Sequence, residues 1–168
     1  LERLRFYGRS LHSLRDDVMD AMLKSASGRA SDLVDLLARM KALQVITGRP
    51  GFDPLMVGFK RANRLVEKEQ WTEEAVDPRL FQHGTESELH KLLLEAQASV
   101  PAALEQGEYP KALEALVAMK PAIDGFFVGV LVNAEDPALR ANRLSLLCAV
   151  NHLFMSFADF SQIVVQGT

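Results

Sequence analysis

Three Asp-Pro dipeptides constrain the fold of this chain more than any other feature. They stand at Asp53-Pro54, Asp77-Pro78 and Asp136-Pro137. An aspartate side chain accepts hydrogen bonds from the unpaired backbone amides at the start of a helix, and a proline at the first helical position loses no hydrogen bond. Each dipeptide therefore predicts the start of a helix.

Apolar residues recur at helical spacing over most of the sequence. The segment after Asp32 carries one such stripe, at Leu33, Leu36, Leu37, Met40 and Leu43. No run of alternating apolar and polar residues has the length of a strand and a hairpin-type turn. We therefore expect an all-α protein, a helical bundle with a long C-terminal helix.

Local signals predict where the first helices begin and end. The first should close near Gly8, the second should cover residues 14–25, and the third should begin at Ser31-Asp32 and end in residues 48–51. Residues 85–88, Thr-Glu-Ser-Glu, fit a capping box that opens a later helix.

Prolines and glycine mark the boundaries of the later helices. Pro101 and Pro121 each remove a backbone donor and are expected to kink or divide their helices. Gly107 and Tyr109-Pro110 predict a turn between them. The last helix is predicted to run from Pro137 to about residue 163 and to be the central helix of the bundle.

Length and composition favour one soluble domain. The chain has 168 residues, of which 48% are hydrophobic, so residues 1–168 can form a single helical domain with its own core. Its single cysteine, Cys148, excludes an intrachain disulfide and suits a reducing cytoplasm. No apolar stretch reaches the roughly 20 residues of a membrane span. Because the chain opens on Leu1 and not on methionine, we expect a fragment of a longer protein.

Charge is distributed unevenly along the chain. The net charge of -3 excludes a general polyanion binder. Basic residues nevertheless exceed acidic ones in residues 1–15 and 60–68, whereas acidic residues predominate in residues 86–114. Any binding of nucleic acid is therefore expected at a local basic cluster.

The pentapeptide Arg-Ala-Asn-Arg-Leu occurs twice, at residues 61–65 and 140–144. On a helix, the two arginines of each copy share one face, and the alanine and leucine share another. Guanidinium groups suit phosphate contacts, although the spacing alone favours a solvated face or an ion pair such as Arg140 with Asp136. The predicted RNA-binding residues are Lys60, Arg61, Arg64, Lys68, Arg140 and Arg143.

Signals for catalysis or metal binding are weak. No two histidines are spaced i, i+4, no Cys/His cluster has zinc-ligand spacing, and no glycine-rich loop follows a strand. Glu86 and His90 are interpreted as a surface pair, and Cys148 as a core residue. Phe126-Phe127 and the series Phe154, Phe157 and Phe160 could stack on bases if exposed, but their spacing favours core packing. We therefore predict no catalytic residue and no metal ligand.

Several segments together resemble one known family. The most specific stretch is Asp-Gly-Phe-Phe at residues 124–127, followed by Val-Leu-Val-Asn-Ala-Glu-Asp at 130–136 and Ala-Leu-Arg-Ala-Asn-Arg-Leu at 138–144. Residues 15–23, 58–64, 76–81 and 159–164 add to it. The chain resembles the C-terminal domain of the bacterial glycyl-tRNA synthetase beta subunit. It departs from the family at Pro137 and Val128, where acidic residues are common.

The resemblance implies a helical anticodon-binding domain of the DALR type, similar to that of arginyl-tRNA synthetase. The expected partner is the anticodon stem-loop of tRNA-Gly, and no DNA or membrane partner is expected. In the family, a two-subunit ligase joins glycine to tRNA with ATP and magnesium, the alpha subunit activates glycine, and the beta subunit engages the tRNA. This chain would then need no cofactor and no catalytic residue of its own. The alternative is a non-catalytic helical module that docks other proteins.

Overall fold

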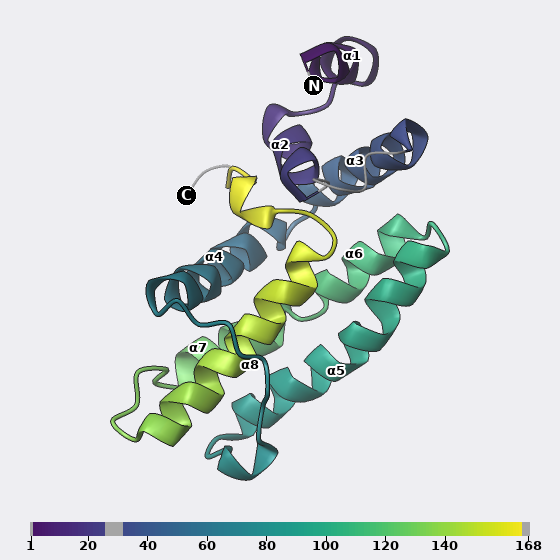
Figure 1. The fold of residues 1–168 in the computed structure, drawn as a ribbon. Coiled ribbons are helices and arrows are strands. Elements are labelled where there is room, and N and C mark those ends of the chain that lie inside the picture. The colour runs from purple at the N-terminus through teal and green to yellow at the C-terminus, as the bar shows by residue number, and fades with distance from the viewer. Residues whose placement is uncertain (1, 26–31, 166–168) are drawn as a thin grey trace.

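The computed structural model describes residues 2–25 and 32–165, and over these ranges it contains α-helices and 3₁₀ helices but no strand (Figure 1). This confirms the predicted all-α class. The elements are α1 (Glu2–His12), α2 (Asp16–Ser25), α3 (Leu33–Thr47), α4 (Phe52–Lys68), η1 (Pro78–Leu80), α5 (Gly84–Glu105), α6 (Tyr109–Val117), α7 (Lys120–Gly129), α8 (Pro137–Met155) and η2 (Phe160–Gln162).

The three Asp-Pro dipeptides have three different outcomes. Asp136 caps α8 as predicted and accepts hydrogen bonds from the amides of Ala138 and Leu139. Asp77 also acts as a cap, but it starts only the single 3₁₀ turn η1. A helix also begins beside Asp53, since α4 starts at Phe52, but the predicted capping role of Asp53 is wrong: the residue before the helix is Gly51, whose φ of +88° favours glycine.

Of the other predicted helix starts, one is confirmed and one is wrong. Asp32 caps α3 as expected, whereas Ser31 lies outside the described residues. The predicted capping box at residues 85–88 is wrong. Helix α5 begins at Gly84, and the carboxylate of Glu86 accepts a hydrogen bond from the amide of His83.

The glycine and proline signals within the helices had different outcomes. Helix α1 does not close at Gly8 but continues to His12, because this glycine is used for close packing: a Cβ there would lie 2.7 Å from Sδ of Met19. Helix α5 is not divided at Pro101, which lies at the surface, where water can bond to the carbonyl that lost its donor. A kink at Pro101 stays a prediction. Pro121 does mark a division, since α6 ends at Val117 and α7 begins at Lys120.

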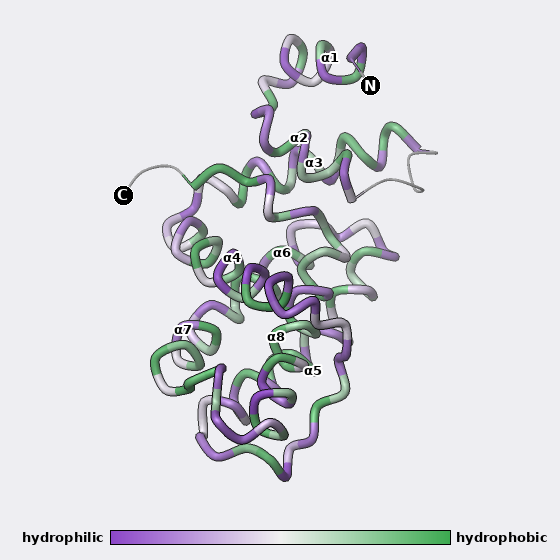
Figure 2. The backbone as a smooth tube through the Cα atoms, turned by 60° about the vertical axis from the view of Figure 1, so that its left-hand side comes forward, coloured by the Kyte–Doolittle hydropathy of each residue, from purple (hydrophilic) through white to green (hydrophobic). Residues whose placement is uncertain are grey.

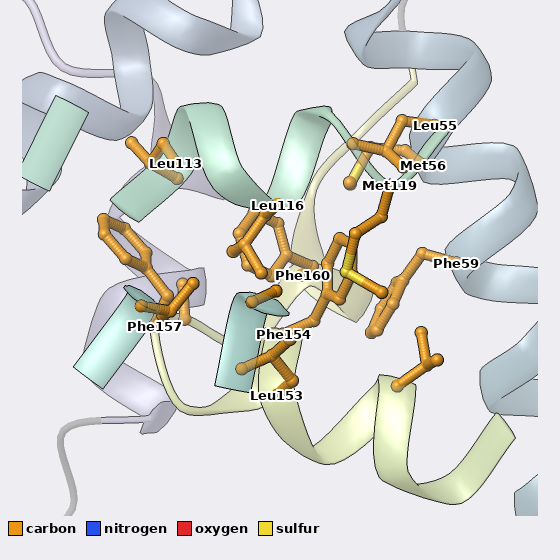
Figure 3. Packing of buried hydrophobic residues seen from close by; sticks show 14 of the residues in the cluster. Leu55, Met56, Phe59, Leu113, Leu116, Met119, Leu153, Phe154, Phe157 and Phe160 are labelled. Carbon is orange, nitrogen blue, oxygen red and sulfur yellow. The ribbon is translucent and has the colours of Figure 1, made fainter. Parts of the chain in front are cut away.

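Helix α8 lies in the middle of the bundle, packed against both α4 and α5 (Figure 1). It ends at Met155, earlier than predicted, and the chain then turns so that Phe157 and Phe160 enter the core from η2 and the turn before it. The ring of Phe154 stacks on that of Phe59 at 5.2 Å (Figure 3). The core role predicted for the phenylalanine series is therefore confirmed.

Individual helices carry both hydrophobic and hydrophilic residues along their length, as the colours in Figure 2 show. This pattern is typical of amphipathic helices that each bury one side. Among residues 2–25 and 32–165, no helix is long and apolar enough to cross a membrane.

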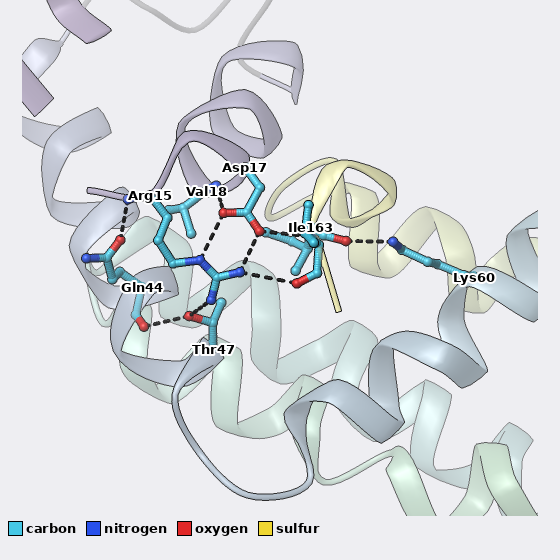
Figure 4. A network of polar contacts seen from close by, with 8 residues as sticks. Arg15, Asp17, Val18, Gln44, Thr47, Lys60 and Ile163 are labelled. Carbon is cyan, nitrogen blue, oxygen red and sulfur yellow. Dashed lines mark hydrogen bonds and ion pairs between the residues drawn. The ribbon is translucent and has the colours of Figure 1, made fainter. Parts of the chain in front are cut away.

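Polar contacts tie the C-terminal segment to α2 and α4 (Figure 4). Asp17 of α2 is paired with Arg15 at 2.6 Å and accepts a hydrogen bond from the amide of Val164 at 2.8 Å. Burial raises the pKa of the Asp17 carboxyl, but the hydrogen bonds from Arg15 and the amides outweigh burial, so the pKa lies below its ordinary value. From α4, Nζ of Lys60 donates to the carbonyl oxygen of Ile163 at 2.6 Å.

Candidate nucleic-acid interface

One exposed face of α4 carries a row of basic residues, Arg61, Arg64 and Lys68, which we call the basic row. Val57 precedes them on the same side of the helix, since the four residues follow one another at intervals of four, three and four, and all four are exposed. The opposite side, which includes Met56, Phe59, Ala62 and Val66, is buried in the core. The amphipathic register of α4 thus points three cations outward in a line.

These three cations have no acidic partner in the part of the chain that the structure describes. Arg61, Arg64 and Lys68 form no ion pair with any described residue, although most other arginines do. The nearest carboxylate in sequence, Glu67, instead accepts a hydrogen bond from the side-chain amide nitrogen of Asn63 at 2.9 Å. The row therefore keeps its full positive charge for an external anion.

Phe127 of α7 positions one of these guanidinium groups. The guanidinium carbon of Arg61 lies over the Phe127 ring, 4.3 Å from its centroid. Phe127 is half-buried and meets the fully buried Phe126 edge to face at 5.6 Å. A cation held over an aromatic ring loses freedom of movement while keeping its charge. Arg61 is therefore oriented before any ligand binds.

Lys60 was predicted to act with Arg61, Arg64 and Lys68, but it points to another side of α4. It is half-buried, and its ammonium group donates to the carbonyl of Ile163 (Figure 4). The structure thus gives Lys60 a role in holding the C-terminal segment. A contact between Lys60 and RNA stays a prediction.

The second copy of the pentapeptide is used differently from the first. Asn63 of the first copy bonds within its own helix, whereas Asn142 is buried and clamps the backbone of Asp77 by accepting from its amide at 2.7 Å and donating to its carbonyl at 3.0 Å. Arg140 is paired with Glu69 at the end of α4, and not with Asp136 as the alternative interpretation suggested. The second copy therefore joins α8 to the α4–α5 connection.

Arg143 forms a buried ion pair with Glu86. Its Nε donates to Oε1 of Glu86 at 2.9 Å, and the side chains are 4% and 1% exposed. Its Nη1 donates to the carbonyl oxygen of Leu131 at 2.8 Å. In this structure its guanidinium is therefore occupied by protein partners, and contact with RNA stays a prediction for this residue.

The environment of Glu86 stabilises its charged form. Burial raises the pKa of this carboxyl, but the hydrogen bonds from Arg143 and from the amides of Gln82 and His83 outweigh burial, so the pKa lies below its ordinary value.

The expected surface pair of Glu86 with His90 is wrong, because the His90 ring packs against Phe81 instead.

An open groove of about 500 Å³ lies beside the basic row. Helix α4 contributes Val57, Arg61, Arg64 and Leu65, and the α7–α8 connection contributes residues 130–133, Val-Leu-Val-Asn. Val57 and Leu131 are 54% and 71% exposed, so the groove offers apolar surface next to two guanidinium groups. The first pentapeptide lines one wall, and Arg143 of the second holds the backbone of the other.

Sequence reasoning missed the apolar part of this site. Val57 and Leu131 are ordinary apolar residues that no local signal marks as part of a binding site. The helical register of residues 57, 61, 64 and 68 could have placed Val57 beside the basic row. Nothing local predicts that residues 130–133 line the same groove as α4, because that arrangement depends on the packing of α7 and the Arg143 pair.

No catalytic or metal-binding constellation is found in the described ranges. Within residues 2–25 and 32–165, no group of three or more His, Cys, Asp or Glu side chains is placed to hold a metal ion. Cys148 is half-buried against the core, and burial together with the nearby Glu74 carboxylate raises the pKa of its thiol. Such a thiol stays protonated and is a poor nucleophile.

Comparison with known proteins gives a consistent result. The profile of the DALR anticodon binding domain matches residues 55–160, a segment that includes both pentapeptides and both walls of the groove. The glycine-tRNA ligase beta subunit of Syntrophus aciditrophicus is 40% identical over 151 residues, which are 90% of this chain and 21% of that protein. Those of Citrifermentans bemidjiense and Myxococcus xanthus are 39% and 38% identical, over 94% and 89% of this chain and 23% and 21% of theirs.

Proposed function

The chain belongs to the DALR anticodon binding domain family, and we propose that it binds the anticodon stem-loop of a tRNA in the groove between α4 and residues 130–133. The observation that carries the proposal is the exposed row of Arg61, Arg64 and Lys68, which has no acidic partner among the described residues and borders apolar surface. An RNA loop presents two kinds of group that such a surface can bind. Its phosphates bind cations, and its unstacked bases bind apolar or planar surface.

The RNA is proposed to be tRNA-Gly. The relatives are named glycine-tRNA ligase beta subunits, and this chain spans about a fifth of their length. We propose that residues 1–168 form one helical domain of such a subunit and that the domain supports ATP-dependent glycylation of tRNA-Gly in the cytoplasm. The alpha subunit would be a partner of the full beta subunit. ATP and magnesium would be used by the full complex.

Titration of the chain with a labelled glycine-specific anticodon stem-loop tests the proposal. Two RNAs serve as controls: a stem-loop with the same stem and an unrelated loop, and a hairpin that copies the acceptor end of the same tRNA. We expect the glycine-specific loop to bind more tightly than either control. Equal affinity for all three RNAs, or no binding up to the solubility limit of the protein, would contradict the proposed function.

One observation favours the alternative function at a different surface. Helix α1 exposes Phe6, Tyr7 and Leu11, with the Phe6 and Tyr7 rings edge to face at 6.0 Å. Exposed apolar groups gathered on one helix are typical of contact with another protein surface. Helix α1 packs on α2 (Figure 1). It contributes no residue to the groove. A protein contact there and RNA binding in the groove are therefore compatible.

A further inference from the structure

The volume of the groove limits how much of an RNA molecule it can hold. Its volume of about 500 Å³ falls within the roughly 300–1,000 Å³ of sites for small organic groups. A double-stranded stem is recognised along its backbone and its shallow minor groove, over a surface much longer than this one. The size therefore favours a single nucleotide that has left the stack of the loop.

We propose that the groove takes one unstacked base of the bound RNA loop, placed against the outer face of the Arg61 guanidinium. This inference rests on the proposed function. The guanidinium carbon of Arg61 lies 4.3 Å from the centroid of the Phe127 ring, and Arg61 is classed as exposed. Guanidinium planes stack on bases as they do on aromatic rings, so ring, guanidinium and base would form three layers.

The remaining lining residues suit the other parts of a nucleotide. Val57 and Leu131 provide apolar surface at the two sides of the groove, which covers the base without choosing among sequences. Arg64 lies one helical turn from Arg61 and is free of acidic partners among the described residues, so it would take the adjacent phosphate.

Asn133 gives the groove a means of selecting the base. Its side-chain amide has both donors and an acceptor, which is what recognition of the edge of an unpaired base requires. It stands on the same wall as Leu131, and the carbonyl of Leu131 is fixed from beneath by Arg143 at 2.8 Å. The selecting group is thus carried on a supported segment of the backbone.

The test replaces each loop nucleotide of the glycine-specific stem-loop, one at a time, by an abasic site. Stacking of a base contributes about 1–3 kcal/mol, so one position should lose affinity about 5- to 150-fold. In the variants Leu131→Ser and Phe127→Leu, the same abasic site should lower the affinity much less. Leu131→Ser removes the apolar wall, and Phe127→Leu removes the ring that supports Arg61. Leu94→Ser is the matched control, since Leu94 is 53% exposed on α5 and does not line the groove.

The outcomes separate the two proposals. If the unmodified stem-loop does not bind the wild-type chain, the proposed function fails. If it binds and no abasic position lowers the affinity, the RNA uses only its backbone and the single-base inference is overturned. Sensitivity to the same abasic position that persists unchanged in Leu131→Ser, with thermal unfolding showing that the variant is folded, would place the base elsewhere and also overturn it.

Discussion

Arg143 and Glu86 join α8 to α5 through a hydrogen-bonded ion pair of 2.9 Å that is almost fully buried. Its importance for the groove comes from the second nitrogen of Arg143, which donates to the carbonyl of Leu131. One guanidinium thus fixes the start of α5 and the wall that faces Arg61. The second pentapeptide acts on the same site as the first, from inside the protein.

Replacement of Arg143 by methionine should destabilise the protein strongly. Breaking a buried ion pair from one side leaves an uncompensated charge, which costs about 3–5 kcal/mol of the free energy of unfolding. Urea denaturation followed by circular dichroism measures the loss. The double variant Arg143→Met/Glu86→Gln should recover part of it, because no charge then remains buried. A loss below about 1 kcal/mol in the single variant would be typical of an exposed pair and would contradict a structural role for this contact.

Acid should weaken the fold through the same carboxyl group. Because the pKa of Glu86 is lower in the folded protein than in the unfolded chain, its contribution is complete above the unfolded-state value and is lost as the pH falls through the folded-state value. Asp17 acts in the same direction. We expect the free energy of unfolding to fall as the pH decreases below about 4.5 and to fall less steeply in Glu86→Gln. Equal slopes for the two proteins would rule out this contribution.

Gly58 sets the distance between α4 and α7 and therefore the position of Arg61 over Phe127. A Cβ at residue 58 would lie 3.0 Å from Cγ2 of the buried Ile123, whose β-branched side chain can move little. Gly58→Ala should lower the free energy of unfolding by about 1 kcal/mol, since overpacking exceeds the gain in helix propensity.

Gly84→Ala is the matched control for this substitution. Gly84 stands at the start of α5, and a Cβ there would meet no atom within 4 Å. Its replacement should leave the protein unchanged or slightly more stable. A Gly58→Ala variant as stable as Gly84→Ala would show that α4 and α7 do not need this close approach.

The helices could be predicted from the sequence because their signals are local. Asp136 and Asp32 cap their helices by bonding to amides two or three residues away, so both partners of each bond lie in the same short stretch of sequence. Signals that tertiary packing can override were less reliable. Gly8 looked like a helix end but serves a close contact with Met19, and Phe160 continued the periodicity of α8 although the chain had already turned.

The candidate site could be predicted only in part for the same reason. Arg61 and Arg64 were correctly expected on a common exposed face, because i, i+3 spacing decides that. The same spacing gave the same expectation for Arg140 and Arg143, yet Arg143 is buried. Two identical pentapeptides differ because Glu86 lies beside only one of them, and Glu86 is 57 residues away in the sequence. No local pattern encodes that meeting.

Salt should weaken stem-loop binding to a degree set by the basic row. If Arg61, Arg64 and Lys68 each neutralise one phosphate, the logarithm of the association constant should fall with the logarithm of salt concentration with a slope of about -2. Fluorescence anisotropy at several potassium chloride concentrations measures the slope, and Lys68→Gln should make it shallower by about 0.7. A slope near zero would mean that phosphate contacts contribute nothing.

The most direct test of the groove as the RNA site is the affinity of the glycine-specific stem-loop for the variant Arg61→Glu/Arg64→Glu. The variant Lys41→Glu/Lys91→Glu changes the net charge equally, but its two exposed residues lie on α3 and α5 outside the groove. Each lost contact to a charged group is worth about 1.5–3 kcal/mol, so the groove variant should bind at least about tenfold more weakly than wild type, and the control much less so. Equal loss in both variants, or wild-type affinity in a folded Arg61→Glu/Arg64→Glu protein, would contradict the account.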